Sequence, residues 1–194
     1  MHSQIYILVS LLCYIITCAF LGLYEKNDRQ RKIALFRSLE NFLTITMLSI
    51  FASYFKYEHI PTYYDSFPVD MLALVVWILM SEVIFSTLHY FLHFPILYRW
   101  IHKQHHENNP SYSTSSLDCN IIEFIITNVG AVAMPMIIWP GSIWMGILWI
   151  AFATVNTCIA HSLEGDHMVH HTEFKYNYGQ GTYVFDKIMG TYKN

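Results

Sequence analysis

The stretch HYFLH (residues 89–93), followed after eight residues by HKQHH (residues 102–106), decides how this chain is organised. A third group, HMVHH (residues 167–171), lies near the C-terminus, and His161 precedes it. Nine of the eleven histidines therefore belong to this pattern. Because residues three and four apart share one face of a helix, the rings within each group are expected to point the same way.

This concentration of imidazoles indicates a transition-metal site, because neutral imidazole is the commonest metal ligand in proteins. Chance clustering of solvated histidines is a poor explanation for three groups at helical spacing. Nine ligands are too many for one ion, whereas two ions would receive four or five each and keep open positions. Open, nitrogen-rich sites suit iron and oxygen activation, while a structural zinc site is closed and four-coordinate. Structurally bound zinc stays an alternative.

The composition is typical of a membrane protein. Hydrophobic residues make up 54% of the 194 residues and charged residues 13%, compared with about 25% charged residues in soluble proteins. The mean hydropathy is +0.33. The length predicts one domain, and the net charge of −3 gives no indication of nucleic-acid binding. The four cysteines show no CxxC spacing, so we expect them to be reduced and structural.

Apolar segments of membrane-spanning length predict an all-α, polytopic helix bundle with about five spans. The expected spans cover residues 5–23, 40–57, 70–88, 120–139 and 142–160. No basic segment precedes the first of them, so we expect an uncleaved helix. The second is the weakest because several Thr and Ser residues dilute its apolar character.

The distribution of positive charge predicts the orientation of this bundle. Ten of the eleven Lys and Arg residues lie in segments 24–39, 89–119 and 161–194, which also hold the nine grouped histidines. The positive-inside rule places these segments in the cytosol, so we expect a cytosolic, histidine-rich cap. A helix from residue 70 through residue 93 would be about 36 Å long, more than the hydrocarbon core of about 30 Å. His89 and His93 are therefore expected at or just beyond the membrane surface.

The order of the three groups, with a membrane hairpin between the second and the third, resembles the sterol desaturase/fatty acid hydroxylase superfamily. The runs FKYNYGQ (residues 174–180) and DKIMGTY (residues 186–192) are similar to the ending of that family. Within them, YNYGQ is most similar to the C-5 sterol desaturase branch. The resemblance covers about residues 80–194. It leads us to expect one membrane domain over residues 1–194, with two N-terminal spans in 1–69 and a fatty acid hydroxylase-like catalytic region in 70–194.

The resemblance implies an O2-dependent, non-haem di-iron oxidase that hydroxylates or desaturates a C–H bond of a sterol or fatty acyl lipid. It implies a lipid substrate from the bilayer, an external electron donor (a b-type cytochrome or a reductase) and, in a eukaryote, the endoplasmic reticulum membrane. No catalytic residue is expected beyond the ligands of the two iron ions. The ligands that the resemblance implies are His89, His93, His102, His105, His106, His161, His167, His170 and His171.

Five further residues are expected to surround these ligands: Glu82, Asn120, Glu123, Asn177 and Tyr178. Glu82 lies inside the third span, where an acid is a functional candidate. It either serves the centre by orienting groups or passing protons, or is a hydrogen-bonded structural acid paired with Ser86 or with a neighbouring helix. Glu123 either orients an imidazole or caps the fourth span. Asn177 and Tyr178 are expected to brace the third group.

Two departures from the family pattern favour an alternative. Asn120 stands where many members carry another histidine, and asparagine is a poor metal ligand. The segment from 161 to 167 is shorter than in the sterol branch, which leaves the substrate open. Both departures favour a divergent, non-catalytic metal-binding membrane protein. A zinc-dependent membrane hydrolase is a weaker alternative because the chain lacks the glutamate of an HExxH helix.

Overall fold

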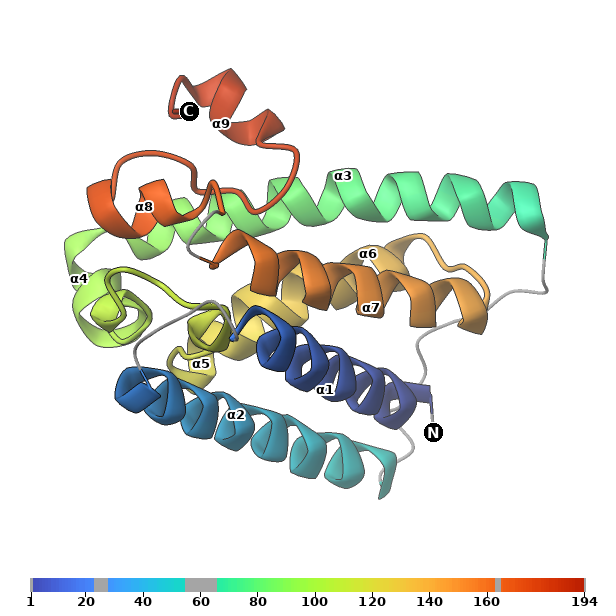
Figure 1. Ribbon diagram of the computed structural model, residues 1–194. Coiled ribbons are helices and arrows are strands. Elements are labelled where there is room, and N and C mark those ends of the chain that lie inside the picture. Colours follow the sequence, from blue (N-terminus) through green and yellow to red (C-terminus); the bar gives the residue numbers. More distant parts are fainter. Residues whose placement is uncertain (1, 23–27, 55–65, 163–164, 194) are drawn as a thin grey trace.

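The computed structural model describes residues 2–22, 28–54, 66–162 and 165–193, and these form helices, turns and loops without a strand. Five helices of the described chain are long and apolar enough to cross a membrane (Figure 1). The predicted all-α, five-span bundle is therefore confirmed. The spans are α1 (His2–Leu21), α2 (Asp28–Tyr54), α3 (Phe67–Leu92), a composite fourth helix over 121–138, and α7 (Ile143–Ala160).

The helices alternate in direction, so the segments that contain the three histidine groups lie at the same end of the bundle. Helices α1, α3 and α7 finish at the end where α2 and the fourth helix begin (Figure 1). The described segments at that end, residues 93–120, 161–162 and 165–193, contain short helices that include α8 (Met168–Glu173) and α9 (Val184–Met189). All three histidine groups consequently lie at this end, which we call the histidine cap.

Helix α2 begins well before residue 40, where the apolar pattern predicted the start of the second span. Its early turns are polar, but they have partners in the cap. Arg37 pairs with Glu107 at 2.9 Å, and Ser38 donates a hydrogen bond to the carbonyl of Thr114. A pattern that counts apolar residues misses such a start, because tertiary contacts satisfy the polar side chains. The predicted end of this span, at residue 57, lies outside the described residues.

The fourth span is a continuous helix with a widened middle. It consists of α5 (Ile121–Glu123), the π-helical segment η4 (Phe124–Val129) and α6 (Gly130–Ile138). After the turn at 139–141, Ser142 caps α7 by accepting from the Met145 amide. Ser142 also donates to Asp70 near the start of α3, with 2.6 Å between Oγ and Oδ2. This bond fastens the hairpin to α3 at the end of the bundle that lies opposite the cap.

Two apolar clusters hold the bundle together. Near the cap, Tyr14 of α1 and Phe42 of α2 pack with Phe124 of the fourth helix. Toward the other end, Trp77 of α3 packs with Trp149 of α7. Many other large apolar side chains are exposed on the outside of the helices, as expected for surfaces that face lipid. None of the four cysteines, all of which are described residues, forms a disulfide.

Candidate metal centre

The first two histidine groups come from the end of α3 and the loop that follows it. His89 lies in the last turn of α3, and His93 caps that helix. The second group does not lie on a regular α-helix, contrary to expectation. His102 ends the π-helical segment η1 (Tyr98–His102), in which the Lys103 amide donates to the Tyr98 carbonyl. His105 begins the 3₁₀ turn η2 (His105–Glu107).

The remaining histidines come from the C-terminal third of the chain. His161 caps α7, His167 precedes α8, and His170 and His171 lie within α8. Eight of the nine grouped histidines are buried, and His93 is half-buried. Segments far apart in the chain thus bring their imidazoles into one enclosed volume.

The nine imidazoles divide into two groups, within each of which the candidate ligand atoms lie within 4.8 Å of one another. The first group, which we call group A, contains His89, His93, His102, His106 and His170. The second, group B, contains His105, His161, His167 and His171. Sequence neighbours therefore separate: His105 and His106 belong to different groups, as do His170 and His171. In α8, successive side chains point about 100° apart, which separates His170 from His171.

Hydrogen bonds orient most of the rings through their Nδ1 atoms. A carbonyl oxygen can only accept a hydrogen bond, so an Nδ1 atom bonded to one must carry the hydrogen. The Nδ1 donors and their carbonyl acceptors are His89 to Tyr178, His105 to Asp118, His161 to Thr157, His167 to Asn177 and Gly179, and His170 to Tyr176. In the neutral rings, the Nε2 atoms are therefore unprotonated. Partners of this kind fix the tautomer and direction of metal-ligating histidines.

The Nε2 atoms then face one another at distances that lone pairs do not favour. His89 and His102 are separated by 2.9 Å between their Nε2 atoms, and His105 and His161 by 3.1 Å. Two ligand nitrogens that lie about 2.1 Å from one metal ion, at a right angle, are about 3.0 Å apart. Both ring nitrogens of His171 are buried without a hydrogen-bond partner among the described residues. The residues present therefore fit a pair of metal ions, one in each group.

Burial keeps these imidazoles in the neutral form that binds metal. Burial lowers the pKa of His105 to about 4, although its hydrogen bond to the Asp118 backbone opposes the shift. It lowers the pKa of His93 to about 4 and that of His167 to about 3, and the neighbouring His105 adds to both shifts. At neutral pH, these rings need lose no proton before they bind a cation.

Two acidic residues support the segment that carries His102, His105 and His106. The Oε1 atom of Glu123 accepts from His102 Nδ1 at 2.8 Å, and both side chains are buried. Glu123 therefore orients an imidazole, and the helix cap is supplied by Asn120, whose side chain accepts from the Ile122 amide. Asp118 accepts from Gln104 and also from Asn108, which holds the loop that carries this group.

The segment between α8 and α9, residues 174–183, is called the C-terminal loop. It supports the histidines of residues 89–93 and 167–171 mainly through its backbone. The fully buried Asp186 accepts from the amides of Tyr178 and Gly179, each at 2.8 Å. Asn177 adopts a positive φ of 54° and donates to the carbonyls of Asp166 and Lys193. Asn177 and Tyr178 thus lie in the loop whose carbonyls contact His167 and His89, and their bracing role stays a prediction. Sequence reasoning missed the acceptor carbonyl of Tyr176 and the anchoring role of Asp186, although Asp186 lies in the family-like ending.

Glu82 supports the same loop from α3. Its carboxylate lies beside Gly179, where an added Cβ would be 2.5 Å from Oε1. Glu82 Oε1 is buried without a hydrogen-bond partner among the described residues. Ser86 Oγ is buried without a hydrogen-bond partner among the described residues, so the expected pairing of Glu82 with Ser86 is absent. Glu82 reaches the histidines only through Gly179, whose carbonyl accepts from His167.

Comparison with known proteins agrees with this geometry. Residues 74–191 match the Fatty acid hydroxylase family. The chain belongs to the fatty acid hydroxylase family. This membership confirms the superfamily that the histidine pattern and the C-terminal runs predicted.

The relatives of this fatty acid hydroxylase family member include sterol desaturases and fatty acid hydroxylase domain proteins. The chain is 29% identical over 133 residues to a Delta(7)-sterol 5(6)-desaturase of Eremothecium gossypii, which covers 63% of this chain and 38% of that protein. It is 33% identical over 131 residues to the fatty acid hydroxylase domain-containing protein 2 of Macaca fascicularis, with coverage of 62% and 38%. The matched region thus spans less than two fifths of either relative. No solved structure matches the chain.

Proposed function

We propose that this protein is a membrane-bound, O2-dependent, non-haem di-iron oxidase that hydroxylates or desaturates a C–H bond of a sterol or fatty acyl lipid. The observation that carries this proposal is the pair of buried histidine groups whose unprotonated Nε2 atoms converge. Membership of the fatty acid hydroxylase family supports the same reaction class. The five apolar helices make the bilayer the natural source of the substrate.

In this proposal, group A holds one metal ion and group B holds the other. When bound, an iron pair supplies the oxygen activation that attack on an unactivated C–H bond requires. Glu123 and the carbonyls of the C-terminal loop hold the rings in the direction and tautomer that ligation needs. Burial of the rings excludes water. Zinc remains the alternative for the metal found in a purified form, because imidazole suits both ions.

The substrate would approach through a cavity of about 310 Å³ beneath the cap. Phe85 and Phe152 form part of its apolar wall, and Glu82 and Asn156 lie among its polar residues. Thr157 also lines it, and the carbonyl of Thr157 accepts from His161 of group B. The cavity is therefore separated from the centre by a single layer of residues. An external b-type cytochrome or reductase would supply the electrons.

The proposed location is a multi-pass membrane protein with the cap in the cytosol, in the endoplasmic reticulum membrane if the source is a eukaryote. The excess of Lys and Arg in the segments at the cap end supports this orientation. We treat residues 1–194 as one membrane domain, with two spans in 1–69 and the catalytic region in 70–194. The cluster that joins Tyr14 and Phe42 to Phe124 supports this single unit. Protease protection of a C-terminal tag in sealed microsomes would contradict a cytosolic cap.

Metal analysis and lipid profiling together test the proposal. Purified wild-type protein is expected to carry about two iron ions per chain. His105→Ala removes a ligand of group B, so we expect it to lose metal and to abolish product formation. His59→Ala is the matched control, because His59 lies outside the three histidine groups. An active His105→Ala variant would refute the assignment. Bound metal with identical lipids in cells with and without the protein would favour the non-catalytic, metal-binding alternative.

A further inference from the structure

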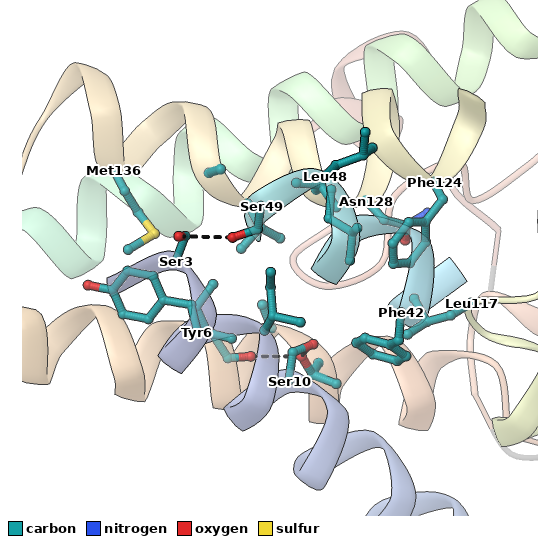
Figure 2. A pocket seen from close by; sticks show the side chains of 18 of the residues that line it. Ser3, Tyr6, Ser10, Phe42, Leu48, Ser49, Leu117, Phe124, Asn128 and Met136 are labelled. Atoms are coloured by element: carbon teal, nitrogen blue, oxygen red, sulfur yellow. Dashed lines mark hydrogen bonds between the residues drawn. The ribbon is translucent and has the colours of Figure 1, made fainter. Parts of the chain in front are cut away.

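A second cavity, of about 460 Å³, lies among α1, α2, the fourth helix and α7 (Figure 2). It adjoins the proposed substrate cavity, since Asn128, Val132, Ala153 and Thr157 line both. Its volume falls in the range of small-molecule sites, about 300–1,000 Å³. The residues that line it on α2 run from Phe42 to Ala52, a distance of about 15 Å along the helix. The cavity is thus elongated along the bundle and as long as about half of the hydrocarbon core.

The position of α2 creates this space. Near the cap, Asn41 donates to the carbonyls of Leu117 and Cys119, which fastens the first half of the helix. Further along, Ser49 bonds to Ser3 of α1 at 3.2 Å. The cavity lies beside the second half of α2, between these attachments and the fourth helix. Because the family match begins at residue 74, α1 and α2 add this cavity to the matched region.

The lining is mostly hydrocarbon, and the hydroxyls of Ser3 and Ser10 are paired, whereas the buried hydroxyl of Tyr6 has no hydrogen-bond partner among the described residues. Among the described residues that line the cavity, none carries a formal charge. Ser10 bonds to Thr154 at 2.8 Å, and Figure 2 shows this bond together with the one between Ser3 and Ser49. The hydroxyl of Tyr6 lies close to Gly146 of α7. A charged occupant would lose its hydration and find no charged partner in this lining, which disfavours it.

The opening of the cavity faces the lipid. Leu48 of α2 and Ile137 of α6 both line it, yet 46% and 53% of their surfaces are exposed. Both residues belong to candidate spans, so their exposed surfaces lie at the depth of the hydrocarbon core. A molecule that enters between these two helices therefore comes from the bilayer and not from water.

We propose that this cavity binds one hydrocarbon chain of a bilayer acyl lipid, inserted between α2 and the fourth helix. The elongated, uncharged shape suits an extended alkyl chain that lies parallel to the spans. The proposal concerns binding alone and requires no bound metal, although four lining residues are shared with the proposed substrate cavity.

Photocrosslinking of the full chain tests this site. Wild-type protein is reconstituted in phosphatidylcholine vesicles that contain phosphatidylcholine with a diazirine in one acyl chain. After illumination, mass spectrometry locates the adducts. We expect adducts on cavity residues such as Ile45 and Ala133. Ala133→Phe fills the cavity and should reduce these adducts severalfold. The matched control is Met134→Phe, because Met134 lies next to it in α6, is 48% exposed and does not line the cavity.

Two outcomes would overturn the proposal. One is that adducts occur only at outward-facing residues such as Leu12, or persist equally in Ala133→Phe. The other is that a photoactivatable sterol in the same vesicles labels the cavity residues in preference to the acyl probe. Ala52→Phe fills the cavity from α2 and replaces Ala133→Phe if that variant fails to fold. Labelling requires no turnover, so a failure here leaves the proposed oxidase intact, and an inactive enzyme leaves the labelling result intact.

Discussion

Glu123 illustrates how one side chain acts on the candidate centre without lying in either histidine group. Its position in the first turn of the fourth span is one where an acid often stabilises a helix N-terminus. In this fold, Asn120 supplies the cap, and Glu123 turns toward His102 instead. The carboxylate is buried, and its second oxygen has no hydrogen-bond partner among the described residues. The carboxylate therefore contacts the imidazole of His102 and does not cap the helix.

Removal of this acceptor should weaken metal binding. We expect Glu123→Ala to reduce metal affinity by about 10- to 100-fold, the usual cost of losing a partner that orients a ligand. Glu123→Gln should lose less, because an amide oxygen still accepts from His102 Nδ1. Metal titration of the purified variants measures the effect. Glu40→Gln, at an exposed position on α2, is the control. Equal affinities for wild type and Glu123→Ala would contradict the orienting role.

At the scale of elements, the C-terminal loop links groups that are far apart in the chain. Its carbonyls at Tyr176, Tyr178 and Gly179 accept from His170, His89 and His167, respectively. Asp186 holds the loop from α9, and Glu82 lies against it from α3. The loop therefore determines the direction of rings in both metal groups.

Two glycines of this loop provide a matched test. In Gly179→Ala, the new Cβ would lie 2.5 Å from Glu82 Oε1 and 3.1 Å from Asp186 Oδ2, so the loop must move. In Gly181→Ala, the nearest atom is Glu82 Oε2 at 3.4 Å, an ordinary contact. We expect Gly179→Ala to lower both the melting temperature and the metal content, and Gly181→Ala to change neither. Equal metal contents and melting temperatures for the two variants would argue against a fixed loop.

At the scale of the whole molecule, enclosing nine imidazoles makes the metal-free fold sensitive to acid. The folded-state pKa values of His105, about 4, and His167, about 3, lie below the ordinary value of 6.5. Between these values, the unfolded chain binds protons that the folded chain does not. Stability is therefore complete above pH 6.5 and decreases as the pH falls toward 4 and then 3.

Thermal unfolding of the metal-depleted protein in detergent checks this dependence. The melting temperature should fall steadily from pH 7 to pH 4. The double variant His105→Gln and His167→Gln removes two titrating groups, so its melting temperature should depend less steeply on pH over the same range. Added Fe²⁺ should stabilise the wild type more at pH 7 than at pH 5, because protons compete for the ligands. Equal slopes for the two proteins would show that other groups govern the acid sensitivity.

Local patterns in the sequence were sufficient to predict the five spans, the three histidine segments and the family. Hydropathy located the five spans because a lipid-facing helix needs apolar side chains along its length. The three histidine segments could be recognised in the sequence because the histidines of each segment are close together in the chain. The start of α2 was placed too late, since its polar turns depend on partners such as Glu107 that lie far away in the chain.

Only the tertiary structure decided how the histidines divide and what orients them. His105 and His106 are adjacent and chemically identical, so their assignment to different groups depends on the rotation of the irregular turns that carry them. The choice of Tyr176 or Gly179 as an acceptor leaves no trace in the sequence, because every residue has a backbone carbonyl. The path of the loop selects the carbonyl that faces each ring, and long-range packing fixes that path.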